Sequence, residues 1–149
     1  MNYKKPVSVL VLIHSPLPDC DILLLERAGH PGYWQSVTGS QEGDESLLHT
    51  AVREVAEETG IVAAPIDLVD WQQTNVFEIF PEWRHRYAPG VTHNTEHVFS
   101  LQVPRDTPVR TAPDEHLGHC WLPLAAAAAK VFSWSNRDAI LALPQRLRS

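Results

Sequence analysis

The sequence predicts an α/β fold in which a mixed, curved β-sheet is sandwiched between helices. Two patterns predict it: apolar, β-branched runs recur along the chain, and segments with helical period lie between them. The length of 149 residues is that of one ordinary domain. Hydrophobic residues make up 44% and charged residues 20%, as in a soluble globular protein, and no repeat or linker divides the chain. We therefore expect a single domain over residues 1–149.

Two strands and a long helix are expected in the first half of the chain. Residues 7–13 are aliphatic almost throughout, as in a central strand buried on both faces. Residues 22–25 follow a proline-containing turn and are expected to return as the second strand of a hairpin. Helical spacing then marks residues 45–59, whose apolar stripe consists of Leu47, Leu48, Ala51, Val52 and Val55. Gly60 is placed to end this helix, because glycine adopts positive φ without strain.

The second half predicts further strands and two helices. The strand candidates are residues 66–72, 74–80, 96–103 and 119–122. An alanine run at 125–129 favours a short helix by intrinsic propensity. Residues 135–143 predict a C-terminal helix, with Ser135 or Asn136 as its N-terminal cap.

Charge and composition exclude several classes of partner. The formal net charge is −6 and there is no long basic run, which argues against a nucleic-acid duplex. The apolar run at 7–13 is too short to cross a bilayer, and the prolines that follow it do not suit a signal peptide. We therefore expect a cytoplasmic protein with no membrane partner. Cys20 and Cys120 lack metal-ligand spacing, which favours two unpaired thiols, although a disulfide between them stays open.

Three carboxylates share one face of the predicted helix. Glu54, Glu57 and Glu58 stand at positions i, i+3 and i+4, on a face expected to lie roughly opposite the apolar stripe. Most glutamate-rich helical stripes are simply solvated, so this cluster alone is weak support for a site. It becomes useful if it holds a hard divalent cation, because Mg²⁺ prefers oxygen ligands.

The residues around these carboxylates complete a known motif. The pattern G-x5-E-x7-R-E-U-x-E-E-x-G-U, in which U is a bulky aliphatic residue, is filled at every position. The matching residues are Gly39, Glu45, Arg53, Glu54, Val55, Glu57, Glu58, Gly60 and Ile61. This stretch resembles the Nudix box, so the chain is identified as a member of the Nudix family. The resemblance implies the Nudix fold, with the box as a loop–helix–loop.

The family resemblance also implies a metal-dependent hydrolysis of a phosphoanhydride bond. Its Mg²⁺ or Mn²⁺ ions would activate a water that attacks phosphorus. The implied metal ligands are Gly39, through its carbonyl, and Glu54, Glu57, Glu58 and Glu115. The implied catalytic residues are Glu57, Glu54, Glu115 and Arg53. Arg53 is expected to hold a carboxylate in one rotamer, with Glu45 or Glu57 as its partner.

The resemblance extends beyond the box to bacterial dihydroneopterin triphosphate diphosphatases, one branch of the Nudix family. It rests on residues 34–40, 77–80, 84–92, 94–96 and 133–137. It implies hydrolysis of dihydroneopterin triphosphate to the monophosphate and pyrophosphate, a step of folate biosynthesis. The implied substrate contacts are Lys4, Arg27, Thr38, Ser133, Arg86 and Trp34. Cationic side chains suit a triphosphate, and an aromatic ring suits a flat pterin.

Two other functions stay open from the sequence. The box does not separate the pterin substrate from nucleoside triphosphates, including oxidised ones, which other Nudix pyrophosphohydrolases cleave. A Nudix domain that senses a ligand without turnover is less favoured, because every box carboxylate is present. In all cases the expected partner is a small phosphorylated molecule, and we expect a monomer or a weak dimer.

Overall fold

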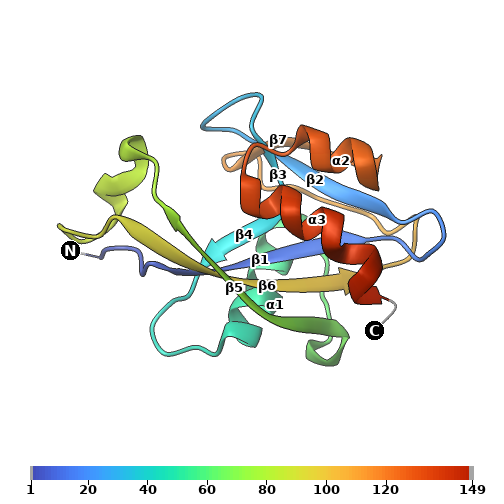
Figure 1. The fold of residues 1–149 in the computed structure, drawn as a ribbon, viewed down its shortest axis with the longest axis horizontal. Coiled ribbons are helices and arrows are strands. Elements are labelled where there is room, and N and C mark those ends of the chain that lie inside the picture. The colour runs from blue at the N-terminus through green and yellow to red at the C-terminus, as the bar shows by residue number, and fades with distance from the viewer. Residues whose placement is uncertain (1, 148–149) are drawn as a thin grey trace.

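A computed structural model describes residues 2–147 and contains one mixed sheet with helices on both sides (Figure 1). The seven strands of this region are β1 (Val7–His14), β2 (Asp21–Arg27), β3 (Trp34–Gln35), β4 (Val37–Ser40), β5 (Leu68–Glu78), β6 (His93–Gln102) and β7 (His116–Pro123). The α-helices are α1 (Leu47–Thr59), α2 (Leu124–Lys130) and α3 (Trp134–Leu147). Two 3₁₀ helices, η1 (Pro65–Asp67) and η2 (Pro81–Arg86), flank β5. The predicted α/β architecture is confirmed.

The centre of the sheet is a parallel pair of strands far apart in sequence. β1 runs beside β6 in register from Val7 opposite Thr95 to His14 opposite Gln102. The other pairings are antiparallel: β4 lies on β1, β5 lies on β6, and β7 lies along β2. The predicted hairpin of β1 and β2 pairs over a very short stretch, with His14 opposite Ile22. Most of β2 pairs with β7 instead. The sheet is therefore mixed, as predicted.

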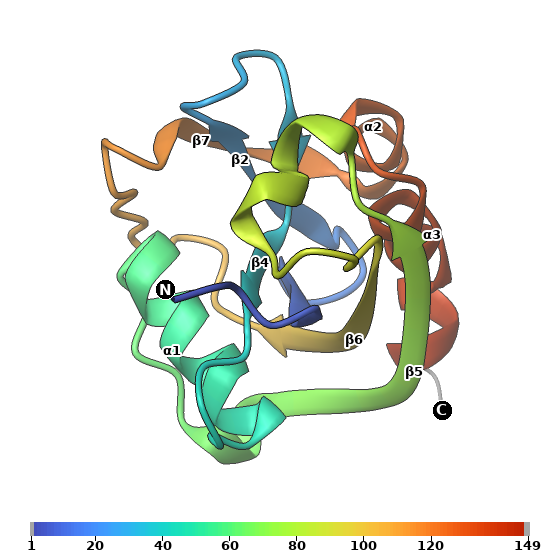
Figure 2. The same cartoon turned by 90° about the vertical axis from the view of Figure 1, so that its left-hand side faces the viewer.

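The central strand is buried on both faces, and its alternate residues enter two different cores. Val9, Val11 and Ile13 pack towards α1, whereas Leu10 and Leu12 pack towards α2 and α3. Figure 2 shows α1 on one side of the sheet and α3 on the other. Because strand side chains alternate with a period of two, one aliphatic run supplies both cores.

Helix α1 begins two residues later than predicted, and its apolar stripe also differs from the prediction. The Ser46 side chain caps it by accepting from the backbone N–H of His49, at 3.0 Å. Gly60 ends it with φ at 77°, as predicted. Leu48, assigned to the apolar stripe, is 38% exposed, so the stripe is narrower than predicted.

Two further predictions about local structure need correction. Residues 66–72 and 74–80 were predicted as separate strands, but β5 is one strand with an irregular register between Asp70 and Thr74. Gln72, at φ 53°, absorbs this irregularity. Helix α3 starts at Trp134, and its capping side chain is Ser133, whose Oγ accepts from the backbone N–H of Asn136 at 3.1 Å. Neither Ser135 nor Asn136 caps it.

The two cysteines, Cys20 and Cys120, are unpaired, as the composition favoured. Cys20 is buried beside His14, with its Sγ 3.6 Å from Nδ1. Between residues 2 and 147 no helix has the length and apolar character needed to cross a membrane.

Candidate active site

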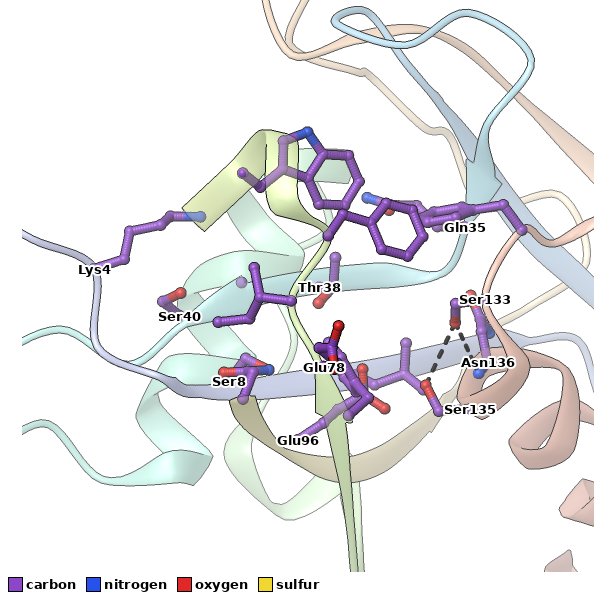
Figure 3. A pocket seen from close by; sticks show the side chains of 18 of the residues that line it. Lys4, Ser8, Gln35, Thr38, Ser40, Glu78, Glu96, Ser133, Ser135 and Asn136 are labelled. Carbon is purple, nitrogen blue, oxygen red and sulfur yellow. Dashed lines mark hydrogen bonds between the residues drawn. The ribbon is translucent and has the colours of Figure 1, made fainter. Parts of the chain in front are cut away.

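Two adjoining cavities open between β4, α1, η2 and the start of α3. The inner cavity has a volume of about 360 Å³ and the outer one about 1150 Å³. Both are lined by the same set of residues along their common border: Lys4, Arg27, Gln35, Thr38, Gly39, Ser40 and Arg86. The inner cavity is shown in Figure 3. The box carboxylates of α1, Glu54, Glu57 and Glu58, line only the outer cavity, so the two spaces together form a continuous site with chemically distinct ends.

The three carboxylates of α1 differ in their surroundings. The Glu58 side chain is 3% exposed and that of Glu54 is 13% exposed, whereas that of Glu57 is 55% exposed. This acidic face was predicted to lie opposite the buried side of the helix, and that prediction is wrong. The three carboxylates lie at the edge of the buried side. Gly39 makes this possible, because a Cβ at that position would collide with the Glu54 carboxylate.

The Glu58 carboxylate is poorly compensated by the protein. Burial raises the pKa of Glu58 well above its ordinary value, and the hydrogen bond with Glu54 and the charges of Glu54 and Glu115 raise it further. Burial also raises the pKa of Glu54. Among residues 2–147, Glu58 Oε1 has no hydrogen-bond partner. A divalent cation between these carboxylates would supply the missing positive charge, so the donor set fits a hard metal ion.

The side chains as they stand do not form a complete metal cage. Within the part of the chain that the structure describes, no three His, Cys, Asp or Glu side chains are grouped to hold an ion. The Glu57 carboxylate lies 3.2 Å from Arg53 Nη1, and its side chain is 55% exposed. Because this side chain is exposed, rotation towards Glu54 and Glu58 would cost little. Glu115 lines the same outer cavity.

Arg53 ties the loop before α1 to the helix. Its Nη2 and Nε donate to the two carboxylate oxygens of Glu45 at 2.6 and 3.2 Å, in a bidentate pair. Nη2 also donates to the Ser40 carbonyl at 3.0 Å, and Nη1 donates to Glu54 at 2.6 Å. The two partners considered from the sequence, Glu45 and Glu57, are both used. Arg53 thereby fixes Glu54 beside Gly39.

The Glu45–Arg53 pair predicts a specific loss of stability in acid. Hydrogen bonding to Arg53 lowers the pKa of Glu45 to about 2, below its ordinary value of 4.5. A carboxylate with a lowered folded-state pKa contributes stability above its unfolded pKa, and this is lost as pH falls towards about 2. We expect the difference in unfolding free energy between the wild type and Glu45→Gln to shrink by about 1–2 kcal/mol from pH 6 to pH 2.5, allowing for solvent screening.

Urea unfolding at a series of pH values measures this difference. The matched control is Glu78→Gln, which removes a carboxylate from the exposed pair with Arg84, at 2.9 Å. Such a pair contributes little, so its difference from the wild type should stay nearly constant. A constant difference for Glu45→Gln as well would contradict the assigned role of the pair.

Three cationic side chains meet at the border between the cavities. Arg27 and Arg86 both lie over the Trp83 ring, with their guanidinium carbons 4.6 and 6.0 Å from its centroid. Burial lowers the pKa of Lys4, and the nearby Arg86 and Arg27 lower it further. The backbone N–H of Lys4 donates to the Arg86 carbonyl at 2.9 Å, which holds the N-terminal segment against η2. Such a concentration of charge in an acidic protein favours an anion.

The inner cavity combines aromatic walls with a polar floor. Phe80 stacks on Trp83 with ring centroids 4.9 Å apart, and Phe132 meets the Trp83 ring edge-on at 6.2 Å. The polar residues that line it include Ser8, Asn94, Glu96, Ser135 and Asn136. Figure 3 shows the Ser8, Glu96 and Ser135 side chains on the side of the pocket away from the aromatic rings. A flat, polar ring fits such a space.

Most of the residues predicted to contact substrate lie around these cavities. Lys4, Arg27, Thr38 and Arg86 line both, and Ser133 lines the inner one, while Glu115, predicted as a catalytic residue and metal ligand, lines the outer one. Trp34 is the exception, since it lines neither cavity. It packs against the core beneath α2 and α3, with the Lys130 ammonium 4.9 Å from its ring centroid. The aromatic walls of the inner cavity come instead from Phe80, Trp83 and Phe132.

Comparison with known proteins identifies the family. The sequence model of the NUDIX domain matches residues 4–143. The chain belongs to the Nudix family. The dihydroneopterin triphosphate diphosphatase of Escherichia coli K12 is 49% identical over 140 residues, 93% of this chain and 91% of that protein. The enzyme of the same name from Haemophilus influenzae is 40% identical over 143 residues, 94% of this chain and 88% of that protein.

A solved structure gives the same result at the level of the fold. The E. coli dihydroneopterin triphosphate pyrophosphohydrolase superposes on this Nudix protein with a TM-score of 0.86, at 47% identity. The superposition covers 94% of this chain and 95% of the other. The predicted Nudix fold is confirmed, and this Nudix hydrolase carries its box carboxylates at the outer of the two cavities.

Proposed function

We propose that this Nudix hydrolase converts dihydroneopterin triphosphate to dihydroneopterin monophosphate and pyrophosphate, with Mg²⁺ as its ion and residues 1–149 as one domain. The observation that supports the proposal is the order of three parts along the site. The inner cavity is polar and has room for a ring, the cationic border follows it, and the outer cavity with its carboxylates comes last. A pterin triphosphate has matching parts in the same order. The similarity to two bacterial enzymes that carry this name supports the choice.

The cationic border would bind the phosphate chain. Arg27 Nη1 donates to Gln35 at 3.1 Å, but its Nε is buried and has no acceptor within residues 2–147. A phosphate oxygen would satisfy this donor, because guanidinium and phosphate form short, charge-assisted hydrogen bonds. Lys4 and Arg86, on the same border, would neutralise further negative charge.

The hydrolysis would take place in the outer cavity, at the carboxylates of α1. Glu54, Glu57 and Glu58, with the Gly39 carbonyl, would hold the divalent ion, and Arg53 would keep Glu54 in its orientation. When bound, such an ion neutralises phosphate charge and lowers the pKa of water. Glu115 lines the same outer cavity, in the segment before β7, where it would accept a proton or complete the ligand set.

Substitution of Arg27 tests the cationic border. Arg27→Lys keeps the charge but removes the planar fork and the Nε donor, so we expect KM for the triphosphate to rise about tenfold with a smaller change in kcat. Arg105→Lys is the control, because Arg105 is an exposed residue paired with Asp21 and lies outside both cavities. An unchanged KM for Arg27→Lys would remove Arg27 from the substrate site.

Initial rates on a substrate panel separate the pterin from its nearest rivals. Nucleoside triphosphates also carry a flat heterocycle and three phosphates, and the box does not exclude them. We expect kcat/KM for dihydroneopterin triphosphate to exceed that for each nucleotide, oxidised ones included. A preference of tenfold or more for a nucleotide, about 1.4 kcal/mol in the transition state, would replace the pterin assignment while keeping the Nudix chemistry.

A further inference from the structure

One face of the central strands changes from apolar to polar where it enters the inner cavity. Leu10 on β1 and Val98 on β6 belong to the core beneath α3. Two residues earlier on each strand, and therefore on the same face, stand Ser8 and Glu96, which are register neighbours. Glu96 is only 4% exposed. Burial of a carboxylate costs several kcal/mol unless it is paired, so this position calls for a partner.

The polar atoms left unpaired on this floor are all of one kind. Asn94 uses its Nδ2 to donate to Ser8 Oγ at 2.8 Å, and its Oδ1 has no partner. Glu96 Oε1 also lacks a partner, and none of the ion pairs among residues 2–147 includes Glu96. Both unpaired atoms are buried acceptors, and they belong to residues that line the inner cavity. A ligand that satisfies them must present N–H donors.

We propose that Glu96 is the specificity-determining residue of the inner cavity and accepts two adjacent N–H groups from a 2-amino-4-oxopyrimidine edge. That edge carries a ring N–H beside an exocyclic amino group, which together match a carboxylate in a bidentate pair. Pterins and guanine present this edge. Adenine and cytosine place a ring acceptor beside the amino group, so a carboxylate would meet a lone pair. This inference rests on the proposed function and adds how the site recognises the ring of the substrate.

The rest of the cavity supports this orientation of the ring. Burial raises the pKa of Glu96, while hydrogen bonds from Ser135 and Asn75 lower it, and no cationic side chain pairs with this carboxylate among residues 2–147. Arg27, whose Nε is an unpaired donor, lines the outer cavity together with the carboxylates of α1. A substrate with N–H donors at its ring and anionic oxygens at its tail satisfies both ends at once.

The test measures kcat and KM of the full chain with Mg²⁺ on dihydroneopterin triphosphate, GTP and ATP, for the wild type, Glu96→Gln and Glu82→Gln. Glu82 is the control, because it is an exposed glutamate of η2 that lines neither cavity. We expect Glu96→Gln to lower kcat/KM by about 30–100-fold on the pterin and on GTP, mainly through KM. ATP should change less than threefold, and Glu82→Gln should leave all three substrates nearly unchanged.

Each outcome decides the inference. Selective loss on the pterin and GTP, with the GTP-to-ATP preference reduced, supports it. A loss of less than threefold on both overturns it, as does an equal loss on all three substrates, which would mark Glu96 as structural. If the wild type turns over nucleotides but not the pterin, the proposed substrate fails. The GTP-to-ATP ratio of Glu96→Gln against the wild type then still decides the role of Glu96.

Discussion

Replacement of Glu58 by glutamine is expected to lower kcat by about 10³-fold and, at the same time, to stabilise the protein against unfolding without added metal. The loss follows because charge stabilisation by a bound ion supplies several kcal/mol to the transition state, and each 1.4 kcal/mol is a factor of ten. The gain follows because burial and the charges of Glu54 and Glu115 already raise the pKa of Glu58. A neutral amide removes that repulsion.

The two effects are measured on the same preparations. Initial rates at saturating substrate give kcat, and thermal unfolding with chelator and with millimolar Mg²⁺ gives the stability. Mg²⁺ should raise the Tm of the wild type, and this increase should be much smaller for Glu58→Gln. Glu82→Gln, an exposed glutamate of η2, is the control and should match the wild type in both. Full activity of Glu58→Gln would exclude Glu58 from the ligand set.

Substitution of Gly39 by alanine is expected to lower kcat/KM by about 100-fold or more. A Cβ at this position would collide with the Glu54 carboxylate, which must then move away from its place in the outer cavity. A displacement of about 1 Å in a catalytic group costs about 10²-fold in rate. The backbone change itself is small, because Gly39 is not among the glycines at positive φ.

Gly118→Ala is the matched control for this substitution. Gly118 lies on β7, also without positive φ, and a Cβ there would meet nothing within 4 Å. Both variants should fold, as judged by circular dichroism and thermal unfolding, and only Gly39→Ala should lose activity. If the two variants keep equal activity, then close approach of Glu54 to Gly39 is not required for catalysis.

The local part of the site could be predicted from the sequence. Glu54, Glu57 and Glu58 lie on one helix, so their spacing fixes their relative positions before any tertiary contact is known. The pairing of Arg53 with Glu45 also follows from a short loop next to that helix. What the spacing does not fix is the rotation of the helix against the sheet. For that reason the burial of Glu58 was not predicted.

The ring-binding part of the site could not be predicted in the same way. Ser8 and Glu96 become neighbours only through the parallel pairing of β1 with β6, which joins distant segments of the chain. In the sequence, Glu96 is one polar residue at the start of a predicted strand, with nothing to indicate burial. Trp34 shows the converse, because this large aromatic residue near the motif was predicted to contact the ligand, but it packs against the core and lines neither cavity.

The measurement that tests the central proposal most directly is identification of the products from dihydroneopterin triphosphate with Mg²⁺ in ¹⁸O-labelled water. We predict pyrophosphate and dihydroneopterin monophosphate in equal amounts, one of them carrying the label, and no reaction in excess chelator. The labelled product would also identify the phosphorus that water attacks. Release of single phosphate groups, or no reaction in conditions where a nucleoside triphosphate is cleaved, would contradict the proposed function.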